Sequence, residues 1–180
     1  MGGPMLIRNY GLFWREDCVF WGAGGQGNDG QLLGVPARNR TANPINFREQ
    51  RGVYALYAQY ELVYVGQVGS GNHRLFSRLK QHLTDALAER WNRFSWFGIN
   101  RVLNTDDLAD DAEGAHTTVD GVLDHIEAIL IHSAEPVQNR QGGRFGDDVV
   151  QYLQHRDDRL GPTADEMIRA LWEEHVGPSN

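Results

Sequence analysis

The sequence contains a single cysteine, Cys18, in 180 residues. One cysteine excludes an internal disulfide and a zinc site built from several cysteines, and it is typical of a reducing compartment. The chain also lacks an apolar run of 18 residues, and its first residues lack a basic segment followed by a sustained apolar stretch. We therefore expect a cytoplasmic protein with no membrane span and no export signal.

Lysine is also scarce, because Lys80 is the only lysine among 17 basic residues. The net charge of −7 argues against nucleic acid as a partner, since affinity for nucleic acid depends largely on neutralising phosphates. The charge is unevenly distributed, however: residues 1–105 carry 12 basic and 7 acidic side chains, whereas residues 106–180 carry 5 and 17. Residues 1–105 are therefore basic enough to bind a polyanion such as nucleic acid.

The chain has the length of one ordinary domain, and its apolar periodicity predicts strands and helices along most of it. The predicted elements are strands at 52–57, 62–66 and 95–103 and helices at 73–90, 119–133, 147–156 and 163–175. Short aromatic runs joined by a glycine-rich stretch predict further strands within residues 5–35. The aromatic residues Phe13, Trp14, Phe20 and Trp21 are expected to form either part of a core or a docking surface for a larger assembly.

Two tyrosines occupy similar places in the predicted hairpin of residues 51–67. Tyr54 follows Gly52 by two positions, and Tyr64 precedes Gly66 by two positions. Tyrosine is common in strands, so the simplest interpretation is core or cross-strand packing. The hairpin alone assigns these tyrosines no other role.

Polar residues border the apolar stripes of two predicted helices. In the helix at 73–90, Arg78 and His82 lie about 40° apart around the axis, so they either share a pocket or flank a core face. In the helix at 119–133, Glu127 falls at the margin of the stripe, where a carboxylate should be paired, hydrogen-bonded or bound to a cation. The predicted stripe of this second helix comprises Val119, Val122, Leu123, Ile126, Ile129 and Leu130.

Taken in order, these motifs resemble those of the GIY-YIG nuclease family. Gly52–Val53–Tyr54 resembles the first signature of the family, and Tyr64–Val65–Gly66 resembles the second. Arg78–Leu79 followed by His82 resembles the R-L-x-x-H helix of the family.

The later part of the resemblance involves one glutamate and one asparagine. Glu127 resembles the metal-binding glutamate of the family, and Asn139, which follows Pro136, resembles its later asparagine. The resemblance covers roughly residues 50–142.

The resemblance implies an α/β fold of the α+β sandwich kind, with a small mixed sheet of about three strands flanked by helices. It divides the chain into an N-terminal β-rich extension (1–46), a GIY-YIG-like nuclease domain (47–146) and a C-terminal helical tail (147–180). The two flanking segments are left without an assigned role.

The resemblance further implies a DNA endonuclease that hydrolyses phosphodiester bonds with Mg²⁺ or Mn²⁺. In that role Glu127 is a hard oxygen ligand of one metal ion, and Arg78 donates a bidentate pair of hydrogen bonds to the scissile phosphate. Asn139 fixes the site through hydrogen bonds, or alternatively caps its own loop.

The resemblance places Tyr54 and Tyr64 over the same site, where one activates water and the other orients water or phosphate. A tyrosine with an unperturbed pKa of about 10 is a poor base at neutral pH unless a neighbour takes its proton. His82, one turn beyond Arg78, is the expected acceptor, because Gln67 stands where many members of the family carry a lysine or another basic group.

A second departure from the family pattern concerns the arginine of the site. The segment Gly69–Asn72 resembles an insertion, so spacing alone favours Arg74, whereas the flanking leucines Leu75 and Leu79 favour Arg78. Both positions therefore stay open as candidates for the arginine of the site.

DNA is the expected partner, and no membrane partner is expected. A homodimer or a larger defence or repair assembly is compatible with the sequence. The arginines expected to hold DNA are Arg38, Arg40, Arg74, Arg78, Arg140 and Arg144.

The expected role is restriction or defence against phage, and the alternative is DNA repair or recombination. A rival from another class is a non-catalytic DNA-binding or interaction module that has kept the fold.

Overall fold

The structure is a computed structural model, and it describes residues 6–69, 71–109, 119–135 and 145–176. Seven strands are present in this part of the chain: β1 (Asn9–Arg15), β2 (Leu33–Pro36), β3 (Ile45–Asn46), β4 (Gly52–Ala58), β5 (Glu61–Val68), β6 (Arg93–Gly98) and β7 (Val150–Gln154). The helices there are α1 (Leu75–Gln81), α2 (Val119–Ala134) and α3 (Ala164–Val176), with short 3₁₀ turns at Glu16–Cys18 and Asp158–Leu160.

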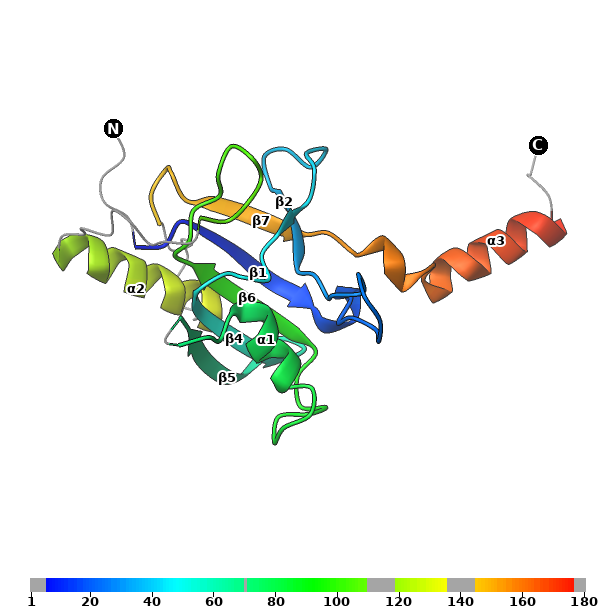
Figure 1. The fold of residues 1–180 in the computed structure, drawn as a ribbon, viewed down its shortest axis with the longest axis horizontal. Coiled ribbons are helices and arrows are strands. Elements are labelled where there is room, and N and C mark those ends of the chain that lie inside the picture. The colour runs from blue at the N-terminus through cyan, green and yellow to red at the C-terminus, as the bar shows by residue number, and fades with distance from the viewer. Residues whose placement is uncertain (1–5, 70, 110–118, 136–144, 177–180) are drawn as a thin grey trace.

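All seven strands belong to one mixed sheet, in the order β3-β2-β7-β1-β6-β4-β5. Strand β1 pairs parallel with β7 and antiparallel with β6, and the other pairings are antiparallel. The prediction of an α/β protein is thus confirmed at this level, but the sheet has seven strands where about three were expected. The additional strands come from both ends of the chain: β1, β2 and β3 precede the predicted strands in the sequence, and β7 follows them. Strand β1 lies between β7 and β6 and so joins the added strands to the predicted ones (Figure 1).

The three strands predicted from the sequence are neighbours at one end of the sheet. Strand β4 lies between β6 and β5, and β5 forms the edge. Strand β6 ends at Gly98 rather than continuing to residue 103. The side chain of Gln50 lies at the place where a Cβ of Gly98 would be, and its Oε1 accepts a hydrogen bond of 2.9 Å from the backbone nitrogen of Asn100. This polar contact takes the place of further strand pairing.

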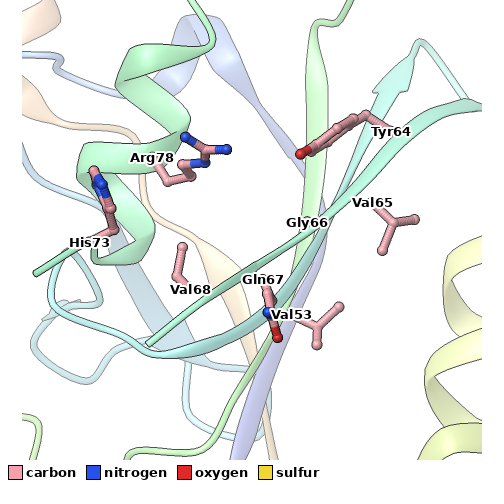
Figure 2. A pocket seen from close by; sticks show the side chains of 8 residues that line it. All are labelled: Val53, Tyr64, Val65, Gly66, Gln67, Val68, His73 and Arg78. Atoms are coloured by element: carbon pink, nitrogen blue, oxygen red, sulfur yellow. The ribbon is translucent and has the colours of Figure 1, made fainter. Parts of the chain in front are cut away.

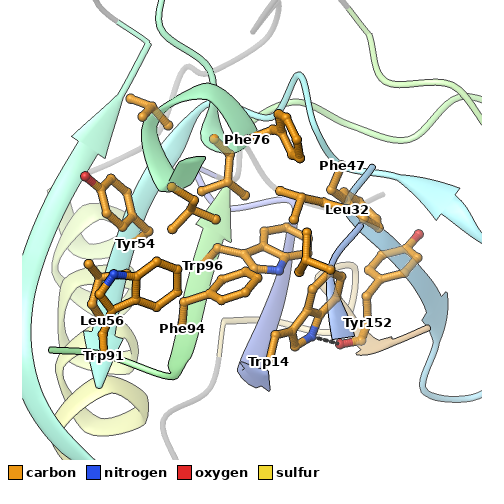
Figure 3. Close-up of a cluster of buried hydrophobic side chains, with 14 of the residues drawn as sticks. Trp14, Leu32, Phe47, Tyr54, Leu56, Phe76, Trp91, Phe94, Trp96 and Tyr152 are labelled. Carbon is orange, nitrogen blue, oxygen red and sulfur yellow. Dashed lines mark hydrogen bonds between the residues drawn. The ribbon is translucent and has the colours of Figure 1, made fainter. Parts of the chain in front are cut away.

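The main hydrophobic core lies between the sheet and α1. Figure 3 shows its aromatic side chains, and the indole nitrogen of Trp14 donates a hydrogen bond of 3.2 Å to the backbone oxygen of Tyr152. Trp14 is 2% exposed, so it belongs to the core and not to a docking surface. This contact ties the N-terminal strand β1 to the C-terminal strand β7.

Helices α1 and α2 cover opposite faces of the sheet. Trp96 of β6 packs in the core beneath α1, whereas its neighbour Phe97 packs in a second cluster with Ala128 of α2. Because successive side chains of a strand point to opposite faces, the two helices must lie on opposite sides. Figure 3 accordingly shows α2 behind the sheet when α1 is in front.

Helix α1 is shorter than predicted, because it ends at Gln81 and turns follow where the helix was expected to reach residue 90. The carboxylate of Asp85 accepts a hydrogen bond of 2.8 Å from the backbone nitrogen of Leu87. Glu89 has a positive φ of 61°. A side chain that binds the backbone locally and a left-handed residue both favour turns over a continued helix.

The helix predicted at 147–156 is wrong, because this segment contains β7. Tyr152 on this strand is buried, and the strand bridges β1 and β2. Valine and tyrosine residues such as Val150 and Tyr152 pack well on a pleated surface. Pairing with β1 and β2 therefore makes this segment a strand, although its short apolar pattern suggested a helix.

Helix α2 has nearly its predicted bounds, but its predicted buried stripe is wrong in part. Leu123, Ile126 and Leu130 are exposed, whereas His125 and Ala128 are buried. The helix is thus rotated about its axis, so that a face different from the predicted one packs against the sheet. The His125 side chain on this face takes part in the packing. Its Nδ1 accepts a hydrogen bond of 3.1 Å from the backbone nitrogen of Ile7.

Helix α3 is confirmed, and it extends away from the sheet at the C-terminal end of the molecule (Figure 1). Its large apolar side chains are exposed, namely Met167, Ile168, Leu171 and Trp172. Within the described residues, no helix is both long and apolar enough to cross a membrane.

Candidate functional site

Gly66 and Gly52, the glycines near Tyr64 and Tyr54, are each required for a different steric reason. A Cβ at Gly66 would lie 2.3 Å from the hydroxyl oxygen of Tyr54, the residue with which Gly66 pairs across the hairpin. Gly52 has φ of +146°, and a Cβ there would lie 2.0 Å from the backbone oxygen of Phe97. The first glycine makes room for the Tyr54 ring, and the second allows the close approach of β4 to β6.

Tyr54 and His82 are joined by a buried hydrogen bond. The hydroxyl oxygen of Tyr54 lies 2.7 Å from Nε2 of His82. The two residues are 0% and 2% exposed, respectively. His82 directly follows α1, and its side chain contacts Tyr54 of β4. Its backbone oxygen accepts a hydrogen bond of 3.3 Å from the indole nitrogen of Trp91. The predicted proximity of one of these tyrosines to His82 is thus present, whereas proton transfer between them stays a prediction.

The second ring nitrogen of His82 meets a carboxylate that was not among the predicted site residues. Nδ1 of His82 lies 2.7 Å from Oδ2 of Asp85. The signal in the sequence is the spacing His82-x-x-Asp85, which places the two side chains close together at the end of a helix.

Tyr64 and Arg78 approach the same cluster from the side of an open pocket. The ring centroids of Tyr64 and His82 are 5.1 Å apart, and those of Tyr54 and Tyr64 are 6.1 Å apart. The pocket has a volume of about 590 Å³, and Tyr64 and Arg78 both line it. Figure 2 shows the hydroxyl end of Tyr64 and the guanidinium of Arg78 facing each other.

The pocket extends around the edge strand β5. Tyr64 pairs with Leu56 of the core beneath α1, so its side chain lies on the α1 face of the sheet. Val65 and Gln67 also line the pocket, and as the alternating residues of β5 they belong to the face that α2 covers. The side chains that line the pocket therefore come from both faces of the sheet at this edge.

The surroundings of Tyr54 oppose its ionisation. Burial raises the pKa of Tyr54 to about 12, although the nearby guanidinium of Arg78 acts in the opposite direction. Interaction with Tyr54 in turn raises the pKa of Arg78. At neutral pH Tyr54 is therefore a neutral hydroxyl beside a guanidinium, and it needs an acceptor before it can give up its proton.

The two candidate arginines occupy different pockets. Arg78 lines the pocket with Tyr64, and its Nη1 donates a hydrogen bond of 2.7 Å to the side-chain oxygen of Gln81. Arg74 lines a second pocket of about 330 Å³ together with Arg48, and its Nη1 donates to the backbone oxygen of Gly71 at 3.0 Å. The structure thus groups Arg78, and not Arg74, with the tyrosines.

Glu127 is exposed on α2 and does not line the tyrosine pocket. Among the residues that the structure describes, no group of three or more histidine, cysteine, aspartate or glutamate side chains is arranged to hold a metal ion. One exposed carboxylate nevertheless fits Mg²⁺, which commonly keeps several waters and takes only one or two protein carboxylates together with substrate phosphates. Glu127 is thus compatible with a single-ligand metal role but is not joined to the tyrosine cluster.

The other predicted residues are either distant in the fold or outside the described part. Arg38 and Arg40 are exposed in the turns that follow β2, and Arg38 lines a separate pocket with Tyr10. Asn139, Arg140 and Arg144 lie outside the described residues.

Comparison of the chain with protein-family models, curated proteins and solved structures finds no match.

Proposed function

We propose that the protein is a metal-dependent DNA endonuclease that hydrolyses phosphodiester bonds. The observation that carries this proposal is the convergence of Tyr54, Tyr64, Arg78 and His82 around one pocket edge, with Tyr54 hydrogen-bonded to His82 at 2.7 Å. These residues come from β4, from β5, and from α1 and the residue that caps its C-terminal end. Together they offer the parts that phosphodiester hydrolysis requires, which are a phosphate clamp, a hydroxyl for the attacking water and a proton acceptor.

The arrangement of the elements supports a GIY-YIG-like core within the larger sheet. Strands β6, β4 and β5 are adjacent and antiparallel, and α1 follows β5 directly. In this proposal these strands with α1 and α2 form the catalytic unit, and β1, β2, β3 and β7 extend its sheet.

Arg78 binds the scissile phosphate in the proposed mechanism. Its guanidinium offers two parallel hydrogen bonds to phosphate oxygens, and it stabilises the charge that grows on them in the transition state. Its position at the pocket rather than in the core suits this role.

The attacking water binds at Tyr64, which lines the pocket, whereas Tyr54 is fully buried. The water proton passes to the Tyr64 oxygen as the Tyr64 proton moves to Tyr54, and the Tyr54 proton moves to Nε2 of His82. The hydroxide attacks phosphorus, the ester P–O bond breaks, and the leaving alkoxide takes a proton from solvent. Glu127 lies apart from this pocket, so a Mg²⁺ held by its carboxylate would supply charge neutralisation to DNA that reaches α2 as well as the pocket.

The proposed biological role is restriction or defence against phage, with DNA repair or recombination as the alternative. A non-catalytic DNA-binding or interaction module is favoured by one observation, since Tyr54 and His82 are almost completely buried, as core residues are. Such a module would bind DNA without cutting it.

Cleavage of supercoiled plasmid in Mg²⁺ and in EDTA tests the proposal. We expect nicked or linear plasmid only with the metal, and a loss of about 10²- to 10⁴-fold in the Tyr64→Phe variant. Tyr60→Phe is the matched control, because Tyr60 is exposed in the turn of the same hairpin. DNA binding without cleavage would favour the module, and unchanged cleavage by Tyr64→Phe would contradict the proposed water site.

A further inference from the structure

His82 is held between two polar partners on opposite sides of its ring. Nε2 lies 2.7 Å from the Tyr54 hydroxyl oxygen, and Nδ1 lies 2.7 Å from Oδ2 of Asp85. A neutral imidazole carries one proton, so one ring nitrogen donates and the other accepts. The partner of Nδ1 therefore decides which role Nε2 has toward Tyr54.

Asp85 is placed to accept and not to donate. Its Oδ1 accepts a hydrogen bond of 2.8 Å from the backbone nitrogen of Leu87, while its Oδ2 faces His82. The Leu87 N–H, and after it the contact with His82, lower the pKa of Asp85 below that of a free aspartate. At neutral pH the carboxylate is ionised, and an ionised carboxylate has only lone pairs to offer to Nδ1.

We propose that Asp85 is a positioning residue that holds His82 in the Nδ1–H tautomer, so that Nε2 accepts the proton of Tyr54. The assignment of the tautomer rests on the hydrogen-bond geometry alone, whereas its catalytic consequence rests on the proposed function. A carboxylate also stabilises the imidazolium that forms when His82 takes the proton. Asp85 thus acts through His82 and does not contact the substrate.

The surroundings of His82 contain one opposing charge. The groups in contact with its ring are Tyr54 from β4, Tyr64 from β5 and Asp85 from the following turn, while the guanidinium of Arg78 from α1 lies beside the two tyrosines. The Asp85 carboxylate and the Arg78 guanidinium carry opposite charges, and it is the carboxylate that contacts the imidazole ring.

Asp85 also caps the turn through Leu87, so a test must separate the two roles. In Asp85→Asn the amide oxygen can still accept from the Leu87 nitrogen, but the amide nitrogen presents hydrogens to His82. Nδ1 must then accept, and the ring changes to the Nε2–H tautomer, in which Nε2 has no lone pair for the Tyr54 proton. Asp85→Glu keeps the carboxylate and is the variant for rescue.

The tautomer can be measured directly by ¹⁵N NMR of the histidine rings, with the His82 signals among the seven histidines assigned from their absence in His82→Gln. We expect Nδ1–H in the wild type and Nε2–H in Asp85→Asn. An Nε2–H tautomer in the wild type, or the same tautomer in both proteins, would overturn the proposal whether or not the protein cleaves DNA.

Plasmid cleavage supplies the second measurement. At saturating DNA we expect Asp85→Asn to cleave ~10²- to 10⁴-fold more slowly, with unchanged DNA affinity and with activity partly restored in Asp85→Glu. A changed tautomer with unchanged cleavage would overturn the positioning role. A wild type that never cleaves DNA would refute the proposed function, while the tautomer measurement would still decide the role of Asp85 toward His82.

Discussion

The Tyr54 hydroxyl lies directly over Gly66, so closely that a Cβ at Gly66 would be 2.3 Å from the hydroxyl oxygen. The two residues pair across the β4–β5 hairpin, and the missing side chain is the space that the tyrosine fills. The second signature glycine is thus a steric requirement of the first signature tyrosine. The hydrogen bond between Tyr54 and His82 depends on this space.

Gly66→Ala should therefore displace Tyr54 and destabilise the protein. We expect the free energy of unfolding to fall by about 1–3 kcal/mol, as for other overpacked sites, when measured by urea denaturation. Gly24→Ala is the control, because a Cβ at Gly24 has no neighbour within 4 Å and its φ is not in the left-handed region. Equal stability of the two variants would show that Tyr54 does not depend on the glycine.

His82→Gln should impair cleavage more at pH 7 than at pH 9. Glutamine can accept the Tyr54 hydrogen bond but cannot take its proton, so the variant depends on the phenolate form. Below the pKa of Tyr54, which is about 12, the phenolate fraction rises roughly tenfold per pH unit. The deficit relative to wild type should shrink by up to about 100-fold over these two units, as measured by single-turnover cleavage.

The control for that pH profile is His73→Gln, since His73 is exposed and lines the same pocket. It should cleave like the wild type at both pH values. A loss in His82→Gln that is the same at pH 7 and pH 9 would assign His82 a positioning role and not proton transfer.

Glu127→Gln should fold and bind DNA but fail to cleave it. The exposed position predicts an unchanged melting temperature, whereas the loss of a metal ligand costs several kcal/mol of barrier, and about 1.4 kcal/mol is tenfold in rate. Affinity is measured in Ca²⁺ and cleavage in Mg²⁺. Asp124→Asn, an exposed carboxylate on the same helix, is the control. Cleavage within a few-fold of that control would remove Glu127 from the site.

Arg38→Glu combined with Arg40→Glu should weaken DNA binding and its dependence on salt. If each arginine contacts one phosphate, the slope of log affinity against log salt should decrease in magnitude by about 2. Arg169→Glu on α3 is the control for a change of charge at an exposed site. An unchanged affinity and slope would place DNA on a different face of the protein.

The sequence predicted the local geometry around the candidate site well, because that geometry depends on short-range patterns. The hairpin strands and the one-turn spacing of Arg78 and His82 are present, and the structure brings both residues to the tyrosines. The sequence could not decide between Arg74 and Arg78. Arg74 directly precedes α1 and Arg78 lies within it, but in the fold only Arg78 lines the tyrosine pocket.

The parts that the sequence could not predict depend on partners far away in the chain. The segment around Tyr152 becomes a strand because β1 and β2 leave a place for it. The exposed Leu123 and the buried His125 of α2 reflect a hydrogen bond to the backbone of Ile7, which no periodicity reveals. The role of Asp85 depends on the contact between His82 and Tyr54, which are 28 residues apart in the sequence.

The most direct test of the account is the single-turnover rate of DNA cleavage in Mg²⁺ by Arg78→Lys, compared with wild type and with Arg74→Lys. Lysine keeps the charge but cannot form the bidentate pair with a phosphate. We predict that Arg78→Lys cleaves ~10²- to 10³-fold more slowly at saturating DNA, with little change in affinity, and that Arg74→Lys cleaves like the wild type. An Arg78→Lys rate within a few-fold of wild type would contradict the proposed catalytic cluster.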